Sequence, residues 1–480
     1  MGGGWVRGVV PAGYHRECRG LYFGRQKPEP EAVWSEVQAV CRRRTCLVIT
    51  EGMSGEERAA ARAAVRTRLR LPGELRAFWW ASLIVLALTV VVGWLKYRAG
   101  TSPYNWNPLS DHLFYDLSEY PGTYTLLHTG AFFNNVAGRP WPYPMYSPVA
   151  YPPFTAVVMA PMYAFPIPEL LYLMVSAAWL VVLIGWAGRA LVRRGIGRVT
   201  AYLFPLTLVV TSFPIARLIH QGNIELVVWM FTAVGVWAFL RGRDDAAAVL
   251  WGLAAAMKLF PLVLLGLMLP RGRTRAFAEG VGTFAGATVA SLWWLGPSMG
   301  VAWRGSLQNV FGYQSKRLAE LTLPSLASNH SVAELVKVAV RIAHYPPDKV
   351  ALPYYACGAL VLGVAFFGRL WKMPVANQLL ALSTFMVMFP TISYFHTLVH
   401  MYAPFAVLCG LAIRAQRVGV PVPGLKGTML LFAPLFAPFT VLTFPQVLLF
   451  GGLVQAALLV AIFGCALQYP FAVDGAKEQA

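Results

Sequence analysis

Charged residues are scarce in this sequence. Asp, Glu, Lys and Arg make up 13% of its 480 residues, whereas soluble globular domains have about 25%. Hydrophobic residues make up 57%, and the mean hydropathy is +0.55. So little charge cannot cover a soluble surface, and so high an apolar content excludes intrinsic disorder. The composition therefore indicates a polytopic membrane protein.

Several other features are missing. Six cysteines in 480 residues are too sparse for a small disulfide scaffold, and we interpret them as reduced thiols. The sequence contains no Walker A loop, no glycine-rich dinucleotide fingerprint after a strand and no H-E-x-x-H. No apolar stretch follows Met1, so no signal peptide is predicted. These absences give no sign of direct ATP use or of a zinc peptidase.

Acidic residues are outnumbered by basic ones, 21 against 40, which gives a net charge of +19. The basic residues lie mostly in short segments between apolar runs, the pattern that keeps positive loops in the cytoplasm. We therefore expect membrane lipids around the protein and no nucleic acid as a partner.

The apolar runs predict an all-α membrane fold with about twelve transmembrane helices and both termini inside. We place the runs at 77–95, 169–188, 199–217, 222–240, 245–258, 260–270, 276–297, 351–369, 376–392, 400–413, 428–444 and 446–467. The pair 245–258 and 260–270 is short, so it forms either one kinked span or a hairpin of half-length helices. Basic clusters on both sides favour a segment that goes out and returns.

The runs divide the chain into three parts. Residues 1–76 are a polar cytoplasmic segment, either a poorly ordered tail or partly sequence upstream of a true start at Met53. Residues 77–470 form the membrane domain, with two long outer segments at about 96–168 and 298–350. The stretch 152–166 is apolar but short, which predicts an interfacial or re-entrant segment. Residues 471–480 form a cytoplasmic tail.

The first outer segment carries carboxylates among aromatic residues. Asp111, Asp116 and Glu119 are the candidate catalytic residues, because a carboxylate can deprotonate a sugar hydroxyl while aromatic faces hold the ring. A carboxylate can also hold a divalent cation. The alternative is a solvated acidic loop with an interfacial aromatic belt.

Two polar features interrupt the apolar runs. His220, Gln221 and Asn223 lie at the outer end of a predicted span, with Glu225 just inside the next. Lys258 lies deep in an apolar run, and intramembrane ionisable residues commonly mark functional sites. The alternatives are a hydrogen-bonded turn for the first feature and a snorkelling side chain for Lys258.

The second outer segment is basic, against the usual charge asymmetry. Arg304, Lys316, Arg317 and Arg341 lie there, and binding the phosphate of a lipid would explain them. The alternative is that long loops tolerate charge. His396 and His400 flank a short predicted outer turn, and we interpret them as structural. No metal site is predicted.

Several short motifs follow one another along the chain. An acidic outer loop ends in Tyr151-Pro-Pro-Phe, and Gln221-Gly-Asn follows. The stretch 252–261, GLAAAMKLFP, then precedes a basic turn, and Asn329-His330-Ser-Val comes later. In this order the motifs resemble those of glycosyltransferase family 87 of the GT-C superfamily of membrane glycosyltransferases, whose Asn-Gln-Ser-Leu is similar to the last of them. The resemblance covers roughly 77–415, and His330 stands where Gln is more usual.

The resemblance implies a GT-C-like fold and a reaction. A polyprenyl-phosphate sugar, of a mannose or arabinofuranose type, is the expected donor, and a glycolipid, glycan or protein is the acceptor. Transfer would occur with inversion on the outer face of the cytoplasmic membrane. Asp116 is the favoured base, with Glu119 as partner and Asp111 as alternative. No cofactor is required, although a divalent cation is possible.

The resemblance also implies substrate-binding residues, and a different function stays open beside it. The implied residues are Tyr151, His220, Gln221, Asn223, Lys258, Lys316, Arg317, Asn329, His330 and Arg341. The alternative function is a transporter or flippase for a lipid-linked sugar. A transporter predicts paired broken helices in two related halves, whereas the sequence shows one such pair.

Overall fold

The computed structural model describes residues 71–98, 113–118, 151–319, 323–344, 346, 349–437 and 451–473, all within the compact unit Arg68–Ala480. The side chains of 96, 97, 115, 118 and 311–325 are outside this description. Most of the predicted segment 1–76, the residues Asp111 and Glu119, and residues 474–480 of the predicted tail lie outside the described residues.

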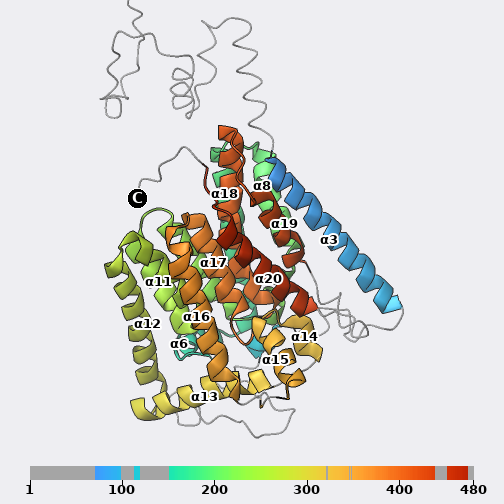
Figure 1. The fold of residues 1–480 in the computed structure, drawn as a ribbon. Coiled ribbons are helices and arrows are strands. Elements are labelled where there is room, and N and C mark those ends of the chain that lie inside the picture. The colour runs from blue at the N-terminus through green and yellow to red at the C-terminus, as the bar shows by residue number, and fades with distance from the viewer. Residues whose placement is uncertain are drawn as a thin grey trace, which may run out of the picture. The chain divides into compact units, whose positions relative to one another are not determined.

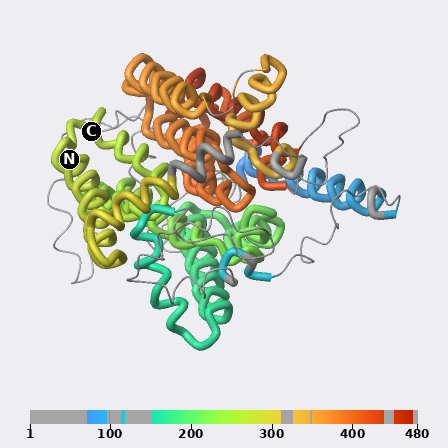
Figure 2. The backbone as a smooth tube through the Cα atoms, turned by 90° about the horizontal axis from the view of Figure 1, so that it is seen from below, coloured from blue at the N-terminus to red at the C-terminus, as the bar shows by residue number. Residues whose placement is uncertain are grey.

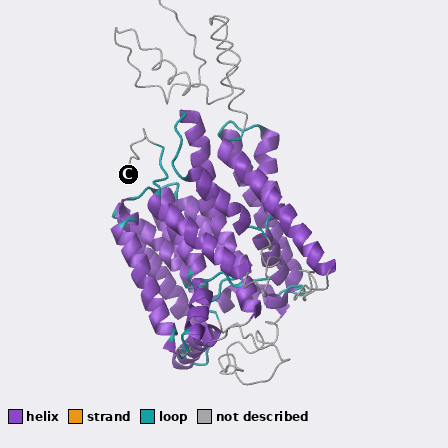
Figure 3. Ribbon diagram, turned by 45° about the vertical axis from the view of Figure 1, so that its right-hand side comes forward, coloured by secondary structure: helices purple, strands orange, loops and turns teal. Residues whose placement is uncertain are grey.

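The regular elements of the described residues are helices (Figure 3). One isolated antiparallel β-bridge pairs Asn329 with Tyr394. The helices are α3 (Gly73–Arg98), α4 (Tyr115–Ser118), α6 (Phe154–Tyr163), α7 (Pro168–Arg193), α8 (Arg198–Thr211), α9 (Phe213–Gln221), α10 (Glu225–Phe239), α11 (Asp244–Met257), η4 (Phe260–Arg271), α12 (Thr274–Leu295), α13 (Met299–Ala319), α14 (Leu323–Ser328), α15 (Val332–Ile342), α16 (Ala351–Gly368), η6 (Leu370–Lys372), α17 (Val375–Met388), η7 (Phe395–Met401), α18 (Tyr402–Val418), α19 (Leu425–Leu435) and α20 (Gly451–Gln468).

Five of the described helices are long and apolar enough to cross a membrane. They lie at Gly73–Leu95, Pro168–Arg193, Ala351–Lys372, Phe395–Val418 and Gly451–Gln468. A bent pair, α8 with α9, makes a sixth if it counts as one span. Trp80 and Val181 are exposed on α3 and α7, as expected where helices face lipid. The protein is thus an all-α membrane protein, and the count of twelve spans stays a prediction.

The predicted run 199–217 is not one straight helix. The chain bends by 57° between α8 and α9. Ser212 lies at the bend, and its hydroxyl oxygen accepts a hydrogen bond from the Ile215 N–H at 3.2 Å. Pro214 in the first turn of α9 cannot donate to a preceding carbonyl. A capping serine followed by proline therefore ends one helix and starts another.

Two segments form 3-10 helices, one in the apolar run predicted at 260–270 and one that begins in the predicted outer turn before 400–413. The first is η4, which follows α11 after a break at Lys258. The second is η7, which is buried throughout and leads directly into α18. His396 and His400 were expected beside an exposed outer turn, but both are only 5% exposed. The span predicted at 400–413 therefore begins earlier, at Phe395.

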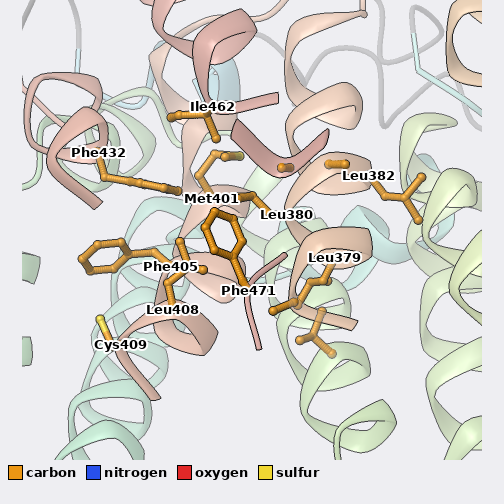
Figure 4. Close-up of a cluster of buried hydrophobic side chains, with 14 of the residues drawn as sticks. Leu379, Leu380, Leu382, Met401, Phe405, Leu408, Cys409, Phe432, Ile462 and Phe471 are labelled. Atoms are coloured by element: carbon orange, nitrogen blue, oxygen red, sulfur yellow. The ribbon is translucent and has the colours of Figure 1, made fainter. Parts of the chain in front are cut away.

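The main core fixes η7 from several sides. Figure 4 shows Met401 of η7 among Leu380 of α17, Phe405 of α18 and Ile462 of α20. Each of these four side chains is at most 2% exposed. Because cores are packed to crystal-like density, this packing fixes the position of η7 next to α9 and α10.

The described chain has two sides that face each other. Figure 2 shows the green helices around α8–α11 on one side and the orange helices around α16–α18 on the other. At one end, α13 lies crosswise beneath α12 and α16 (Figure 1). Since α9 and α10 both contact η7, the two sides meet at the segment that carries His396 and His400.

Candidate functional site

Asp116 is placed by the packing of α4 against α9. The Phe114 N–H donates to the His220 carbonyl at 2.7 Å, and Leu117 is buried at 1% exposure. Gly222 ends α9 with a φ of +64°. A Cβ on Gly222 would lie 2.9 Å from that of Leu117, closer than Cβ contacts allow. The glycine therefore supplies both the left-handed turn and the room for α4.

Asn223 fixes the orientation of Asp116. Its Oδ1 accepts from the Glu225 backbone N–H at 2.8 Å, so its Nδ2 must point the other way. That Nδ2 donates to Asp116 Oδ2 at 2.6 Å. Tyr172 Oη lies 3.0 Å from the Asn223 carbonyl oxygen and secures the same turn. The predicted turn motif and the predicted base thus form one unit.

Burial raises the pKa of Asp116 above its ordinary value of 3.8. The hydrogen bond from Asn223 and the charges of Lys258 and Arg217 act in the opposite direction. A carboxylate whose pKa lies above the usual range is a stronger base when it is ionised. Asp116 therefore has the environment that a general base needs.

Lys258 is held at the break between α11 and η4. Its backbone is extended, with φ −152° and ψ 117°, and its Nζ donates to Glu225 Oε2. The Lys258 side chain is 20% exposed, whereas that of Glu225 is 2% exposed. The ammonium group lies 5.9 Å from the centre of the Tyr151 ring, within reach of a cation–π interaction.

Tyr151 reaches Lys258 because α6 is fastened to the end of α11. Thr155 donates its hydroxyl hydrogen to the Met257 carbonyl at 2.8 Å. This carbonyl belongs to the last turn of α11, where backbone oxygens lack helical partners. The prolines at 152 and 153 start α6 immediately after Tyr151. The motif Tyr-Pro-Pro-Phe therefore delivers an aromatic ring to the site.

Two histidines of η7 complete the site from the opposite side of the fold. His396 Nδ1 lies 2.6 Å from Gln221 Oε1, and His400 Nε2 lies 2.5 Å from Glu225 Oε1. Both pairs join residues 175 positions apart in the chain. The sequence alone favours a structural role for these histidines and does not place Glu225 among the predicted site residues. Their spacing of four on one helix was the available signal.

His220 belongs to the same turn. Its carbonyl accepts the hydrogen bond from Phe114 that anchors α4, and its side chain is 5% exposed. The structure therefore brings together six of the predicted site residues. They are Asp116, Tyr151, His220, Gln221, Asn223 and Lys258.

Asn329 and His330 lie in a second buried polar group. Asn329 Nδ2 donates to Glu334 Oε1 at 2.6 Å and to the Thr391 carbonyl at 3.0 Å. His330 Nε2 lies 2.9 Å from Ser393 Oγ. Burial lowers the pKa of His330 to about 3, so it is neutral at physiological pH. These side chains join the start of α15 to the segment before η7.

The predicted basic residues of the second outer segment lie on α13 and α15. Arg341 is exposed in the last turn of α15. Lys316 and Arg317 belong to α13, and their side chains lie outside the described residues. The charges of Lys258 and Arg217 both act on Asp116, and Lys258 is bonded to Glu225.

Comparison with known proteins gives one match. A sequence model of glycosyltransferase family 87 matches residues 150–393, which is half of the 480-residue chain. The matched range includes Tyr151, the α9–α10 turn, Lys258 and the Asn329–Ser331 turn. No curated protein and no solved structure matches the chain.

Proposed function

This chain belongs to glycosyltransferase family 87 and is a membrane glycosyltransferase, and we propose that its donor is a polyprenyl-phosphate sugar. One observation carries the proposal. A half-buried carboxylate, Asp116, and a tethered ammonium, Lys258, occupy one site, close enough for the charge of Lys258 to lower the pKa of Asp116. Transfer from a phosphate needs both a base and a cation for the leaving group.

The proposed step is a single displacement. Asp116 removes the proton from an acceptor hydroxyl, and the oxygen forms a bond to the anomeric carbon. The bond between that carbon and the phosphate oxygen breaks, and its electron pair leaves with the polyprenyl phosphate. Lys258 stabilises the negative charge on this phosphate. Attack opposite the leaving group inverts the anomeric configuration. Lys316, Arg317 and Arg341 stay alternative partners for the phosphate.

The aromatic side chains of the site suit a sugar. Tyr151 is close to Lys258, and rings of this kind pack against sugar faces while carboxylates and amides bond to the hydroxyls. We propose a mannose-like or arabinofuranose-like sugar and a glycolipid, glycan or protein acceptor. Transfer is expected without a bound cofactor, and adding EDTA to the assay tests a divalent cation.

The wider arrangement is proposed in the same terms. We propose a GT-C-like fold of about twelve membrane helices, with the Asp116 site facing the outside of the cytoplasmic membrane. Seven predicted crossings precede the second outer segment, which supports this arrangement. Cysteines introduced singly beside Asp116 and in the basic loop at 241–243 would report the two sides by accessibility to a membrane-impermeant reagent.

Replacing the base tests the function directly. We expect Asp116→Asn to lower sugar transfer by about 10²–10⁴-fold, the usual contribution of a general base. The assay offers radiolabelled polyprenyl-phosphate sugars and a membrane lipid extract to purified protein in nanodiscs. Asp245→Asn, at an exposed position of α11, is the matched control. Loss in Asp111→Asn instead would make Asp111 the base. Flipping without transfer by the wild type would favour the transporter.

The rate should depend on pH through Asp116. The ionised form is the base, so the rate falls as pH is lowered through the Asp116 pKa. Because that pKa is raised, the acid limb should lie above pH 3.8. Asn223→Ala removes a hydrogen bond that stabilises the ionised form, which should move the limb to higher pH. An unmoved limb in this variant would exclude Asp116 as the titrating base.

A further inference from the structure

Glu225 uses its two carboxylate oxygens for two different partners. Oε2 accepts from Lys258 Nζ, and Oε1 faces His400 Nε2 at 2.5 Å. The three residues come from α10, the end of α11 and η7. If Glu225 simply neutralised Lys258, the ammonium would attract a phosphate only weakly. Whether Glu225, Lys258 and His400 together carry a net positive charge therefore depends on the protons that His400 holds.

The hydrogen bonds around His400 assign its Nδ1 proton. Thr232 Oγ1 lies 3.0 Å from the Trp229 carbonyl oxygen and 3.0 Å from His400 Nδ1. A carbonyl oxygen only accepts, so the one hydroxyl hydrogen of Thr232 goes to Trp229. Both contacts are then satisfied only if His400 Nδ1 carries a proton and donates it to Thr232.

The other side of the ring then needs a second proton. With Nδ1 protonated, a neutral imidazole would present the lone pair of Nε2 to the carboxylate of Glu225. Two lone pairs at 2.5 Å repel each other, so a hydrogen must lie between His400 Nε2 and Glu225 Oε1. Wherever on this line the proton lies, Glu225 and His400 together have no net charge.

We propose that His400 is a positioning residue that acts through Glu225. The proton shared by His400 and Glu225 leaves the group of Glu225, Lys258 and His400 with one net positive charge. Glu225 thus tethers Lys258 without cancelling it, and the charge serves to bind the phosphate of the donor. This inference rests on the proposed function and adds how the phosphate-binding charge is set.

The surroundings make a net charge here effective. Glu225 and His400 are at most 5% exposed, and electrostatic interactions are stronger away from water. The other charged or titratable groups that act on the site are Asp116, Arg217 and His396. Asp116 alone among these carries negative charge, and Asn223 already holds it.

Glutamine substitutions separate the two charge states. The measured quantity is the dissociation constant of undecaprenyl phosphate for the protein in nanodiscs, with the neutral undecaprenol as reference. With Glu225→Gln, His400 becomes neutral and the net charge stays at one. Binding should then change by no more than about threefold. With His400→Gln, the adjacent ammonium keeps Glu225 ionised, the net charge falls to zero and binding should weaken about tenfold or more.

The double variant provides the rescue that a structural role does not. Glu225→Gln with His400→Gln restores one net positive charge, so the affinity for undecaprenyl phosphate should return to that of Glu225→Gln alone. The proposal is overturned if Glu225→Gln tightens phosphate binding about tenfold over wild type while His400→Gln changes nothing. That pattern would mean that Glu225 neutralises Lys258. Failure of the double variant to recover would overturn it too.

A control and a ligand-free measurement complete the test. Glu334→Gln makes the same change in another buried Glu–Lys pair and should leave phosphate affinity unchanged. Nitrogen-15 NMR of histidine-labelled protein, assigned with His400→Gln, should show Nε2 of His400 bonded to a proton. An unbonded Nε2 lone pair overturns the shared proton without touching the proposed function. Equal binding of undecaprenyl phosphate and undecaprenol would contradict the proposed polyprenyl-phosphate donor. The nitrogen-15 signal of His400 would still test the shared proton in that case.

Discussion

Two Glu–Lys pairs with a buried glutamate serve different purposes in this protein. Glu225 and Lys258 are 33 positions apart, and the Lys258 side chain is 20% exposed. Glu334 and Lys337 are three apart on α15, and their side chains are 0% and 4% exposed. One ammonium faces a site, whereas the other is enclosed. Burial of the cation, more than the pairing itself, separates the two.

The carboxylates differ in their second partners as well. Glu225 faces an imidazole that can hold a proton. Glu334 Oε1 accepts from the ammonium of Lys337 at 2.7 Å and from the amide of Asn329 at 2.6 Å. Of these two donors, the ammonium carries the compensating charge and the amide is neutral. The Glu334 pair therefore depends on its lysine, while Glu225 has a second way to be neutralised. We infer that one pair fastens the α15 turn and the other serves chemistry.

Replacing each lysine should show the difference between the two pairs most clearly. Lys337→Met removes the ammonium partner of the buried Glu334, and removing one partner of a buried ion pair typically costs about 3–5 kcal/mol of stability. Lys258→Met should cost less, about 1–2 kcal/mol, because His400 still faces Glu225. Transfer should respond in the opposite order, with a loss of about 10²–10³-fold for Lys258→Met. Thermal melting and transfer per folded molecule measure the two effects.

Equal losses of stability in the two lysine variants would show that His400 does not compensate Glu225. Unchanged transfer in Lys258→Met would move the phosphate to another cation, and Arg341→Ala would be the next variant to assay.

Neutralising both partners should sharpen the contrast. Replacing a whole buried ion pair is often close to neutral for stability, so Glu334→Gln with Lys337→Met should recover most of the loss in Lys337→Met. Glu225→Gln with Lys258→Met should likewise melt near the wild type but recover no transfer. A double-mutant cycle on melting and on transfer gives the coupling in each pair. Recovered transfer in the second double variant would contradict a role for Lys258.

The sequence predicted where the polar residues of the site lie along the chain, because ionisable residues inside apolar runs are costly and so conspicuous. Lys258 and the turn at 220–223 were found in this way. Their assembly could not be predicted, since the contacts of His396 and His400 span 175 positions. Hydrophobic periodicity locates a helix but does not say which residues meet across two of them.

Helix geometry was predicted less well than helix position. The sequence signal for the bend is Ser212 followed closely by Pro214. Both residues lie within one continuous apolar run, which predicts a single straight span. The 3-10 geometry of η4 had no such signal, because an apolar run of that length suits either helix type. Most of η7 lies in a segment that was predicted as an outer turn. The Asn329–His330 motif was predicted to bind substrate, and its side chains bond within the protein. A motif resemblance does not distinguish such a turn from a contact with ligand.

The last expected effect concerns His330, which lies with Asn329 in the second buried polar group. Its pKa falls from 6.5 to about 3 on folding, so the unfolded chain binds a proton that the folded protein excludes. The stability that His330 contributes is full above pH 6.5 and is lost as pH falls toward 3. The loss at pH 5 amounts to about 2 kcal/mol.

His330→Gln should therefore flatten the dependence of melting temperature on pH between 7 and 5. His344→Gln, at an exposed position, is the matched control and should keep the wild-type slope. Because Gln can still bond to Ser393 and Thr397, a change in slope reports the titration rather than lost packing. A slope that His330→Gln leaves unchanged would mean that His330 takes up its proton over the same pH range in the folded protein as in the unfolded chain, and is charged in the fold at pH 5. The second buried group would then carry a charge, and the contrast with the Glu225 group would disappear.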